Sequence, residues 1–258
     1  MTNTVENMGR ALRLHLNFTF QTFCSGKSNY HAFELAKSIA TVKNKSAEVT
    51  VFYGKRGLGK THLLQAIAWE FLENHPKKKV IFVSADDFVW EWKKMKEGCS
   101  EQFEAFINTY MDTDLLLFDN VEMLLETEDI WSTFEGIFKH LCILNKQIVL
   151  TSDKEREELK KLYVLARESS SEVISEEFQE PAYELCKDIL KVQIENLDKV
   201  SYVFSEEIQD FLISKNEGSI LILLGYFWKI IAVGKLEGRE KIDLDYVKEC
   251  LNPSYQVK

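Results

Sequence analysis

The sequence predicts an α/β protein, in which helices flank a parallel sheet and a small helical lid lies at the C-terminal side. Three observations support this fold class. In the first part of the chain, short apolar runs rich in β-branched residues alternate with helical patterns. A glycine-rich turn joins the first of these runs to the first helical pattern, and the later part of the chain shows helical patterns only. Such alternation is typical of parallel strands that are connected by helices.

Four apolar runs bounded by polar or turn residues predict the strands, at residues 49–53, 80–84, 115–118 and 147–151. The third run, Leu-Leu-Leu-Phe, has no polar alternation, as expected for a central strand with helices on both of its faces. Apolar residues at helical spacing predict the helices that connect these strands, at residues 60–73, 86–96 and 129–144.

Beyond Asp153 the strand signals stop. Helical patterns, several of them opened by Ser, Asp or Pro, follow at residues 155–165, 181–196, 205–214, 220–233 and 243–251. We therefore divide the chain into an N-terminal tail (1–16), an α/β domain (17–198) and a helical lid (199–258).

Composition limits the functions that this chain can have. A chain of 258 residues with 45% hydrophobic residues can bury a large core. The net charge of −9 argues against a protein whose main task is to grip duplex DNA, because neutralising phosphates requires clustered Lys and Arg. The 5 cysteines are scattered and never form a CxxC pair, which is typical of reduced thiols in the cytoplasm. Neither a leader nor a membrane span is predicted, since the most apolar stretch, 220–233, is too short and contains Lys229.

The run VTVFYGKRGLGKTH, which begins at Val49, has the GxxxxGK[ST] spacing of a phosphate-binding loop. Its glycines allow backbone N–H groups to surround phosphates, Lys60 can reach the β- and γ-phosphates, and the Thr61 hydroxyl can bind Mg²⁺. The following helix adds the positive end of its dipole. The alternative, a glycine-rich turn without chemistry, is disfavoured by the strand before the loop and the helix after it. We therefore expect ATP or ADP to bind with Mg²⁺. The candidate nucleotide-binding residues are Gly54, Lys55, Arg56, Gly57, Leu58, Gly59, Lys60, Thr61 and His62.

A second signal is the carboxylate that ends the Leu-Leu-Leu-Phe strand. Asp119 stands at a suitable distance after the loop to hold Mg²⁺ through water, so that Thr61 and Asp119 are the candidate metal residues. By itself, this segment would be a strand that ends at a polar turn. A third signal is the Thr-Ser-Asp sequence that ends at Asp153, because the tip of the next strand would point towards the γ-phosphate.

One local basic feature lies outside these signals. Lys93, Lys94 and Lys96 stand near Trp90 and Trp92, and aromatic residues interleaved with Lys can stack on single-stranded bases. The alternative, which we favour, is a core face that includes Trp92 beside a solvated basic face.

Several passages resemble the AAA+ domain of the bacterial replication initiator DnaA. The first is the aromatic-rich segment FTFQTFCSGKSNYHAFELAKSIA, residues 18–40. The resemblance continues through GLGKTHLLQAI, VSADDF, LLLFDN, NKQIVLTSD and IDLDYVKECL, and extends from about Leu16 to Leu251. It implies the two-part AAA+ module, that is, a P-loop domain followed by a helical lid.

The chain departs from the DnaA pattern at three positions that bear on hydrolysis. Asn120 stands where DnaA has a second acidic residue, the usual water activator of AAA+ proteins, and a carboxamide cannot accept a proton. Leu221 stands where the family has a sensor arginine for the γ-phosphate. Arg167 lies in the segment that carries the family's arginine finger, and it is either a shifted finger or a surface residue. The candidate catalytic residues are Asp119, Asn120, Asp153 and Arg167.

A DnaA-like core without a duplex-binding domain is most similar to the Hda-like regulatory paralogues. The resemblance implies regulation of replication initiation through a DnaA-type initiator or another replication protein, and it is compatible with a homo-oligomer. It also implies sliding-clamp contact through Leu12, Leu14 and Leu16, although the expected Gln is replaced by Arg10 and Ala11; an ordinary strand or tail is the alternative. We expect weak intrinsic hydrolysis, no duplex-DNA binding and at most weak single-strand binding. The alternative functions are an autonomous ATPase of helicase-loader type and a nucleotide-holding adaptor.

Overall fold

The computed structural model describes residues 12–41, 48–169, 171–197 and 202–255. Its contacts divide the chain into two compact units. The first unit contains residues 1–23, 30–55 and 60–178. The second unit contains residues 24–29 and 56–59 together with the chain from Gln179 onwards. The predicted boundary between residues 198 and 199 lies outside the described residues, and the contacts place α8 (Tyr183–Glu195) in the second unit.

The first unit is built on a sheet of five strands in the order β2-β3-β4-β1-β5, with every neighbouring pair parallel. The strands are β1 (Glu48–Tyr53), β2 (Val80–Ser84), β3 (Leu115–Asp119), β4 (Gln147–Ser152) and β5 (Glu172–Glu177). The first four confirm the predicted strands. Because the strands are parallel, the carboxyl ends of β1, β3 and β4 meet at one edge of the sheet, where ligands bind in open α/β sheets.

The fifth strand corrects the prediction that strands end at Asp153. β5 pairs with β1 over its whole length, from Glu48 opposite Glu172 to Tyr53 opposite Glu177. Its sequence, Glu-Val-Ile-Ser-Glu-Glu, has only two apolar residues, since an edge strand is covered incompletely and its residues here are half-buried or exposed. A pattern based on burial therefore misses it.

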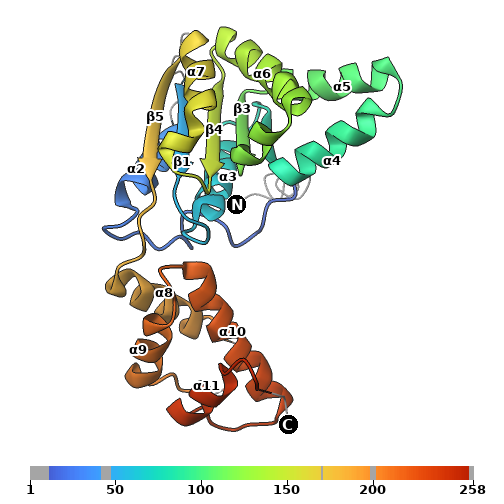
Figure 1. The fold of residues 1–258 in the computed structure, drawn as a ribbon. Coiled ribbons are helices and arrows are strands. Elements are labelled where there is room, and N and C mark those ends of the chain that lie inside the picture. The colour runs from blue at the N-terminus through green and yellow to red at the C-terminus, as the bar shows by residue number, and fades with distance from the viewer. Residues whose placement is uncertain (1–11, 42–47, 170, 198–201, 256–258) are drawn as a thin grey trace. The chain divides into compact units, whose positions relative to one another are not determined.

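Helices cover both faces of the sheet, with α3 on one face and α6 and α7 on the other (Figure 1). Helices α3 (Lys60–Asn74), α4 (Ala85–Lys96) and α6 (Glu128–Ile143) match the predicted helices, whereas the prediction at 155–165 is divided between η2 (Arg156–Leu159) and α7 (Lys160–Glu168). Helix α5 (Ser100–Met111) was not predicted, although Phe103, Phe106, Ile107 and Tyr110 stand at helical spacing. The other elements of this unit are α2 (Tyr30–Thr41) and the short η1 (Val121–Glu126).

A large aromatic core fills the space between the sheet and helices α4 to α7. Phe118 of β3 contacts Phe88 and Phe134 with ring centroids 5.4 and 5.2 Å apart. Trp92 is only 8% exposed, and its indole N–H donates to the Thr133 hydroxyl at 2.9 Å. The core interpretation of Trp92 is therefore correct, and this residue cannot stack on bases.

The second unit is helical, with α8 followed by α9 (Glu206–Ser214), α10 (Ile220–Leu236) and α11 (Leu244–Cys250), as predicted. Side chains cap two of these helices. The Ser219 hydroxyl accepts from the N–H of Ile222, and the Asp243 carboxylate accepts from the N–H of Tyr246. Helix α10 is the most apolar segment, yet none of the helices in the described ranges is long and apolar enough to cross a bilayer.

Candidate nucleotide site

The glycine-rich loop connects the end of β1 to the start of α3. Gly54, Gly57 and Gly59 all have positive φ angles, of 133°, 83° and 99°, which side chains rarely tolerate. At Gly54 a Cβ atom would lie 2.5 Å from the Phe178 carbonyl oxygen, so this position has no room for a side chain. The sequence spacing therefore folds into a turn that glycine adopts readily and other residues do not. The turn leads directly into the N-terminus of a helix, which is an arrangement suited to anions.

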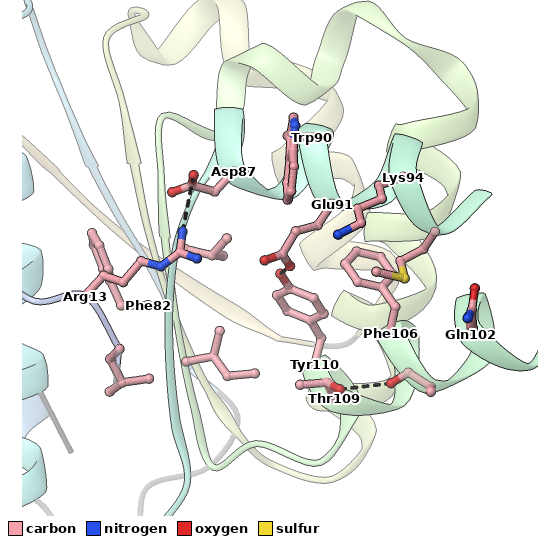
Figure 2. A pocket seen from close by; sticks show the side chains of 15 residues that line it. Arg13, Phe82, Asp87, Trp90, Glu91, Lys94, Gln102, Phe106, Thr109 and Tyr110 are labelled. Carbon is pink, nitrogen blue, oxygen red and sulfur yellow. Dashed lines mark hydrogen bonds and ion pairs between the residues drawn. The ribbon is translucent and has the colours of Figure 1, made fainter. Parts of the chain in front are cut away.

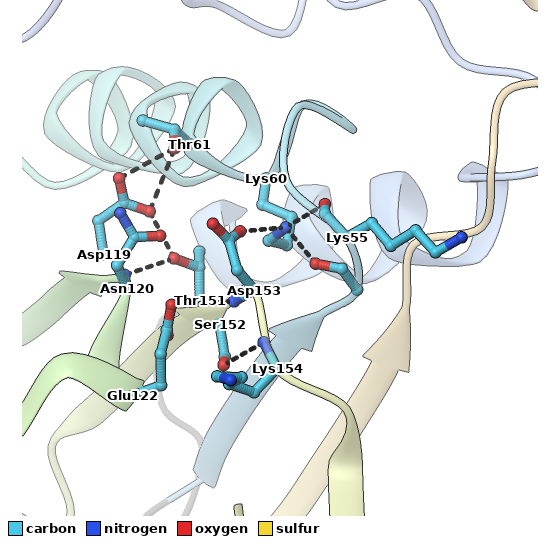
Figure 3. A network of polar contacts seen from close by, with 11 residues as sticks. Lys55, Lys60, Thr61, Asp119, Asn120, Glu122, Thr151, Ser152, Asp153 and Lys154 are labelled. Atoms are coloured by element: carbon cyan, nitrogen blue, oxygen red, sulfur yellow. Dashed lines mark hydrogen bonds and ion pairs between the residues drawn. The ribbon is translucent and has the colours of Figure 1, made fainter. Parts of the chain in front are cut away.

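Lys60 is buried at the base of this loop. Its ammonium group donates to the carbonyl oxygens of Gly54 and Lys55 at 2.5 and 2.7 Å and forms an ion pair with Asp153 Oδ1 at 2.8 Å. The tip of β4 thus lies against the loop lysine (Figure 3). The predicted direction of this tip, towards the γ-phosphate of a nucleotide, stays a prediction.

Asp119, at the tip of β3, is held by hydroxyl groups from two other elements (Figure 3). Thr61 of α3 donates to Oδ2 at 2.9 Å, and Thr151 of β4 donates to Oδ1. Burial raises the pKa of the Asp119 carboxyl, while the hydrogen bonds from Thr151 and Thr61 and the charge of Lys60 oppose this increase. The two candidate metal residues, Thr61 and Asp119, are therefore in direct contact.

These contacts suit Mg²⁺ held together with a nucleotide. A hydroxyl and a carboxylate are oxygen donors, and Mg²⁺ typically takes one or two carboxylates with phosphates and waters. Nowhere in the described part of the chain do three or more His, Cys, Asp or Glu side chains gather as a metal cage. The donor set fits a cation that the phosphates help to bind.

Asn120 follows Asp119 in the left-handed conformation, with φ 60° and ψ 49°, and its N–H donates to the Thr151 hydroxyl at 2.9 Å. Glu122 lies close by on η1. Its Oε1 accepts from the N–H of Asp153 at 3.2 Å, and its buried Oε2 has no hydrogen-bond partner among the described residues. Burial raises the pKa of the Glu122 carboxyl. This second carboxylate is therefore near the site, although the sequence motif did not include it.

His62 contacts the aromatic segment that precedes α2. Its ring stacks on Phe18 with centroids 4.7 Å apart and meets Phe23 edge-on at 5.1 Å. Nε2 donates to the Thr19 carbonyl at 3.0 Å, which requires the proton on Nε2. Burial lowers the His62 pKa, His15 lowers it further, and the Thr19 carbonyl opposes the decrease. In this structure, His62 joins the aromatic segment before α2 to α3.

Arg167, the candidate arginine finger, and Leu221, at the position of the family's sensor arginine, have different surroundings. Arg167 is exposed in the last turn of α7, with no ion-pair partner among the residues that the structure describes. In the second unit, the Leu221 N–H donates to the Gly57 carbonyl at 3.2 Å, while the Leu221 side chain is 57% exposed. This position contacts the glycine-rich loop through its backbone, and its side chain carries no charge.

The N-terminal leucines have different environments. Leu14 is only 5% exposed, whereas Leu16 is 46% exposed. The segment is attached to α3, since the His15 N–H donates to Gln65 and the Trp69 indole donates to the His15 carbonyl. Arg10 and Ala11, at the position of the expected Gln, lie outside the described residues. In this arrangement Leu14 is not accessible to a partner.

A groove of about 1070 Å³ lies between β2 and helices α4 and α5 (Figure 2). Arg13 and Lys94 supply positive charge to its wall, and Asp87 and Glu91 supply negative charge. Trp90 is 62% exposed, with the Lys94 ammonium 5.1 Å from its ring centroid. This balance of charges differs from the basic groove that tracks a nucleic-acid backbone.

A five-stranded parallel sheet, a glycine-rich loop that leads into α3 and an acidic strand tip beside it, together with a helical second unit, define an AAA+ nucleotide-binding protein. The family model for the bacterial DnaA ATPase domain matches residues 14–169. The chain belongs to the bacterial DnaA ATPase family.

Related proteins and structures agree with this assignment. The chain is 30% identical to the chromosomal replication initiator protein DnaA of Acholeplasma laidlawii over 95% of this chain and 54% of that protein. It is 33% identical to DnaA of Onion yellows phytoplasma over 81% of this chain and 43% of that protein. The chain thus spans roughly half the length of these relatives.

Among solved structures, domain III of DnaA from Thermotoga maritima has a TM-score of 0.78 and 27% identity, covering 92% of this chain and 97% of that one. The AMPPCP-bound DnaA of Aquifex aeolicus has a TM-score of 0.68 and 28% identity, and the match covers 87% of this chain and 66% of that one.

The environment of His62 predicts a pH dependence of stability. Because its native pKa is lowered, the unfolded chain binds a proton at His62 more readily than the native protein does, so stability decreases as the pH falls through about 6.5. His62→Phe, which keeps a stacking ring, should lose less stability between pH 7.5 and pH 5.5, as measured by urea unfolding. The matched control is His31→Phe at an exposed position. An equal pH dependence in His62→Phe and wild type would contradict this assignment.

Proposed function

We propose that this chain binds ATP or ADP with Mg²⁺ at the glycine-rich loop and regulates or assists replication initiation through protein partners. The observation that carries the nucleotide proposal is at the carboxyl edge of the sheet, where Thr61 donates to Asp119 and the charge of the neighbouring Lys60 acts on the same carboxylate. The adenine nucleotide analogue named for the Aquifex aeolicus relative supports the choice of an adenine nucleotide.

Each side chain has a defined role in this proposal. The Lys60 ammonium, which now contacts two carbonyls and Asp153, would exchange the Asp153 contact for the β- and γ-phosphates. Thr61 and Asp119 would hold Mg²⁺, which when bound offsets negative charge on the phosphates. The backbone N–H groups of residues 54–59 and the N-terminus of α3 would surround the phosphate oxygens.

Lys60→Ala should abolish nucleotide binding, because it removes the buried positive charge at the base of the loop. Lys154→Ala is the matched control, since Lys154 is an exposed lysine near the site that pairs with Glu158. Calorimetric titration with ADP and Mg²⁺ measures the affinity. Saturating ADP should also stabilise the wild type, by about 2.7 kcal/mol at 100 times Kd. Wild-type affinity in Lys60→Ala would exclude this loop as the nucleotide site.

We further propose that intrinsic hydrolysis is slow. Asn120 cannot accept a proton from water, and Leu221 brings no charge to the γ-phosphate. The nearby Glu122 carboxylate is the one observation that favours the alternative, an autonomous ATPase, because a buried carboxylate with a raised pKa is suited to accept a proton.

Asn120→Asp should increase the rate of ATP hydrolysis, because a carboxylate at this position can act as a general base, an effect worth about a hundredfold. Steady-state phosphate release at saturating ATP provides the measurement, with Asn145→Asp as a control Asn at another left-handed position. A wild-type rate of about one per second or faster, typical of ATPases, would contradict the proposal. Glu122→Gln would then show whether Glu122 acts as the base.

The regulatory part of the proposal is an Hda-like action on a DnaA-type initiator. Two features support it. Asn120 and Leu221 stand where the family has an acidic water activator and a sensor arginine, and the exposed guanidinium of Arg167 can enter a neighbouring subunit's site as an arginine finger. Clamp binding through Leu12, Leu14 and Leu16 would require this segment to leave α3, because Leu14 is buried there. Single-strand binding near Trp90 would be weak, given the mixed charge of the groove.

Arg167→Ala should leave nucleotide affinity and folding unchanged and should remove the stimulation of a DnaA-type partner's ATP hydrolysis. The finger acts in trans, on charge that develops at the γ-phosphate of the adjacent subunit. Turnover by the partner is measured with the two proteins mixed, and Arg156→Ala serves as the control, an exposed arginine on η2. Arg167→Lys should restore little, because the forked geometry is lost. Full stimulation by Arg167→Ala would identify Arg167 as a surface residue, and no stimulation by the wild type would favour a nucleotide-holding adaptor.

A further inference from the structure

We propose that Thr151 is the residue that positions Asp119 for Mg²⁺, an inference that rests on the proposed nucleotide site. The Mg²⁺ dependence of nucleotide binding would then rely on a buried hydroxyl of β4 that contacts neither the metal nor the nucleotide.

The geometry assigns a direction to both hydrogen bonds of this hydroxyl. Thr151 is fully buried, and its Oγ1 lies within hydrogen-bond distance of the Asn120 backbone nitrogen, at 2.9 Å, and of Asp119 Oδ1. An amide N–H can only donate, so Oγ1 accepts from Asn120. The single proton of the hydroxyl is therefore directed at the Asp119 carboxylate.

Two hydroxyls thus fix the Asp119 carboxylate from two elements. Thr61 of α3 lies 2.9 Å from Oδ2 and 3.2 Å from Oδ1, and Thr151 of β4 donates to Oδ1. Thr61 is itself a candidate Mg²⁺ ligand. Thr151 is therefore the hydroxyl whose role is limited to orienting the Asp119 carboxylate. Without Thr151 the carboxylate would be held from one side and could rotate about its Cβ–Cγ bond.

The same hydroxyl also fixes the backbone after Asp119. Asn120 has a left-handed conformation, which is uncommon for residues other than Gly, and its N–H is held by Thr151. The position of the Asp119 main chain and the orientation of its carboxylate therefore both depend on one side chain. Groups that orient metal ligands in this way typically contribute 10- to 100-fold to metal affinity.

The experiment compares nucleotide affinity with Mg²⁺ and with EDTA in Thr151→Val, Thr151→Ser and wild type. Mg²⁺ increases ADP affinity by a certain factor, and in Thr151→Val this factor should be about 10- to 100-fold smaller than in the wild type. The ADP affinity of Thr151→Val in EDTA should stay at the wild-type value. Thr151→Ser should retain the gain because it keeps the hydroxyl. Thr113→Val is the matched control, since Thr113 is also buried, and its hydroxyl bonds backbone carbonyls of Lys79 and Leu115.

Two results would overturn the proposal. One is an increase of ADP affinity by Mg²⁺ in Thr151→Val that equals the increase in the wild type. The other is an equal loss of affinity with and without Mg²⁺, which would show a general structural role. If Thr151→Val does not fold, as judged by its unfolding transition, Thr151→Cys replaces it because a thiol is only a weak donor. Failure of the proposed nucleotide site would appear separately, as an absence of ADP binding by the wild type under either condition.

Discussion

The hydrogen bond between Thr61 and Asp119 joins residues that are 58 positions apart, and the site depends on it. It can form only if α3 starts at the edge of the sheet where β3 ends. The strand order meets this requirement, because β4 lies between β1 and β3, and α3 packs across both β3 and β4. The parallel sheet is therefore what brings the loop and the acidic strand tip together.

The site keeps charge inside the protein. Lys60 and Asp119 are both buried, and buried charges are tolerated only when they are paired and hydrogen-bonded. Lys60 meets this condition through Asp153 and two carbonyls, whereas Asp119 relies mainly on neutral hydroxyls and has a raised pKa. The carboxylate is thus held in an environment that is unfavourable to its charge, and a bound cation would relieve it. Unfavourable charge of this kind is commonly retained where function needs it.

Much of this arrangement could be predicted from the sequence, because its signals are local. Glycine spacing after a strand predicts a loop that leads into a helix, and an all-apolar strand predicts a central position. The structure places Gly54 directly after β1, Lys60 at the start of α3 and Asp119 at the end of the central strand β3. The contacts of Thr151 and Glu122 could not be predicted, since they depend on which strands pair and on how η1 turns after β3. The nucleotide-binding role of His62 stays a prediction from its place in the motif. Its ring contacts with Phe18 and Phe23 could not be predicted, because they depend on how the segment before α2 packs against α3.

The edge strand β5 has a consequence for the protein in a crowded solution. A strand at the edge of a sheet exposes unpaired backbone groups, which another chain can use to extend the sheet. Glu172, Glu176 and Glu177 stand at the ends of this strand, and close approach of a second acidic strand would bring like charges together. The same carboxylates that make β5 difficult to predict from an apolar pattern therefore also oppose sheet extension between molecules. A charge-neutralising change along β5 would remove a barrier to aggregation while leaving the fold in place.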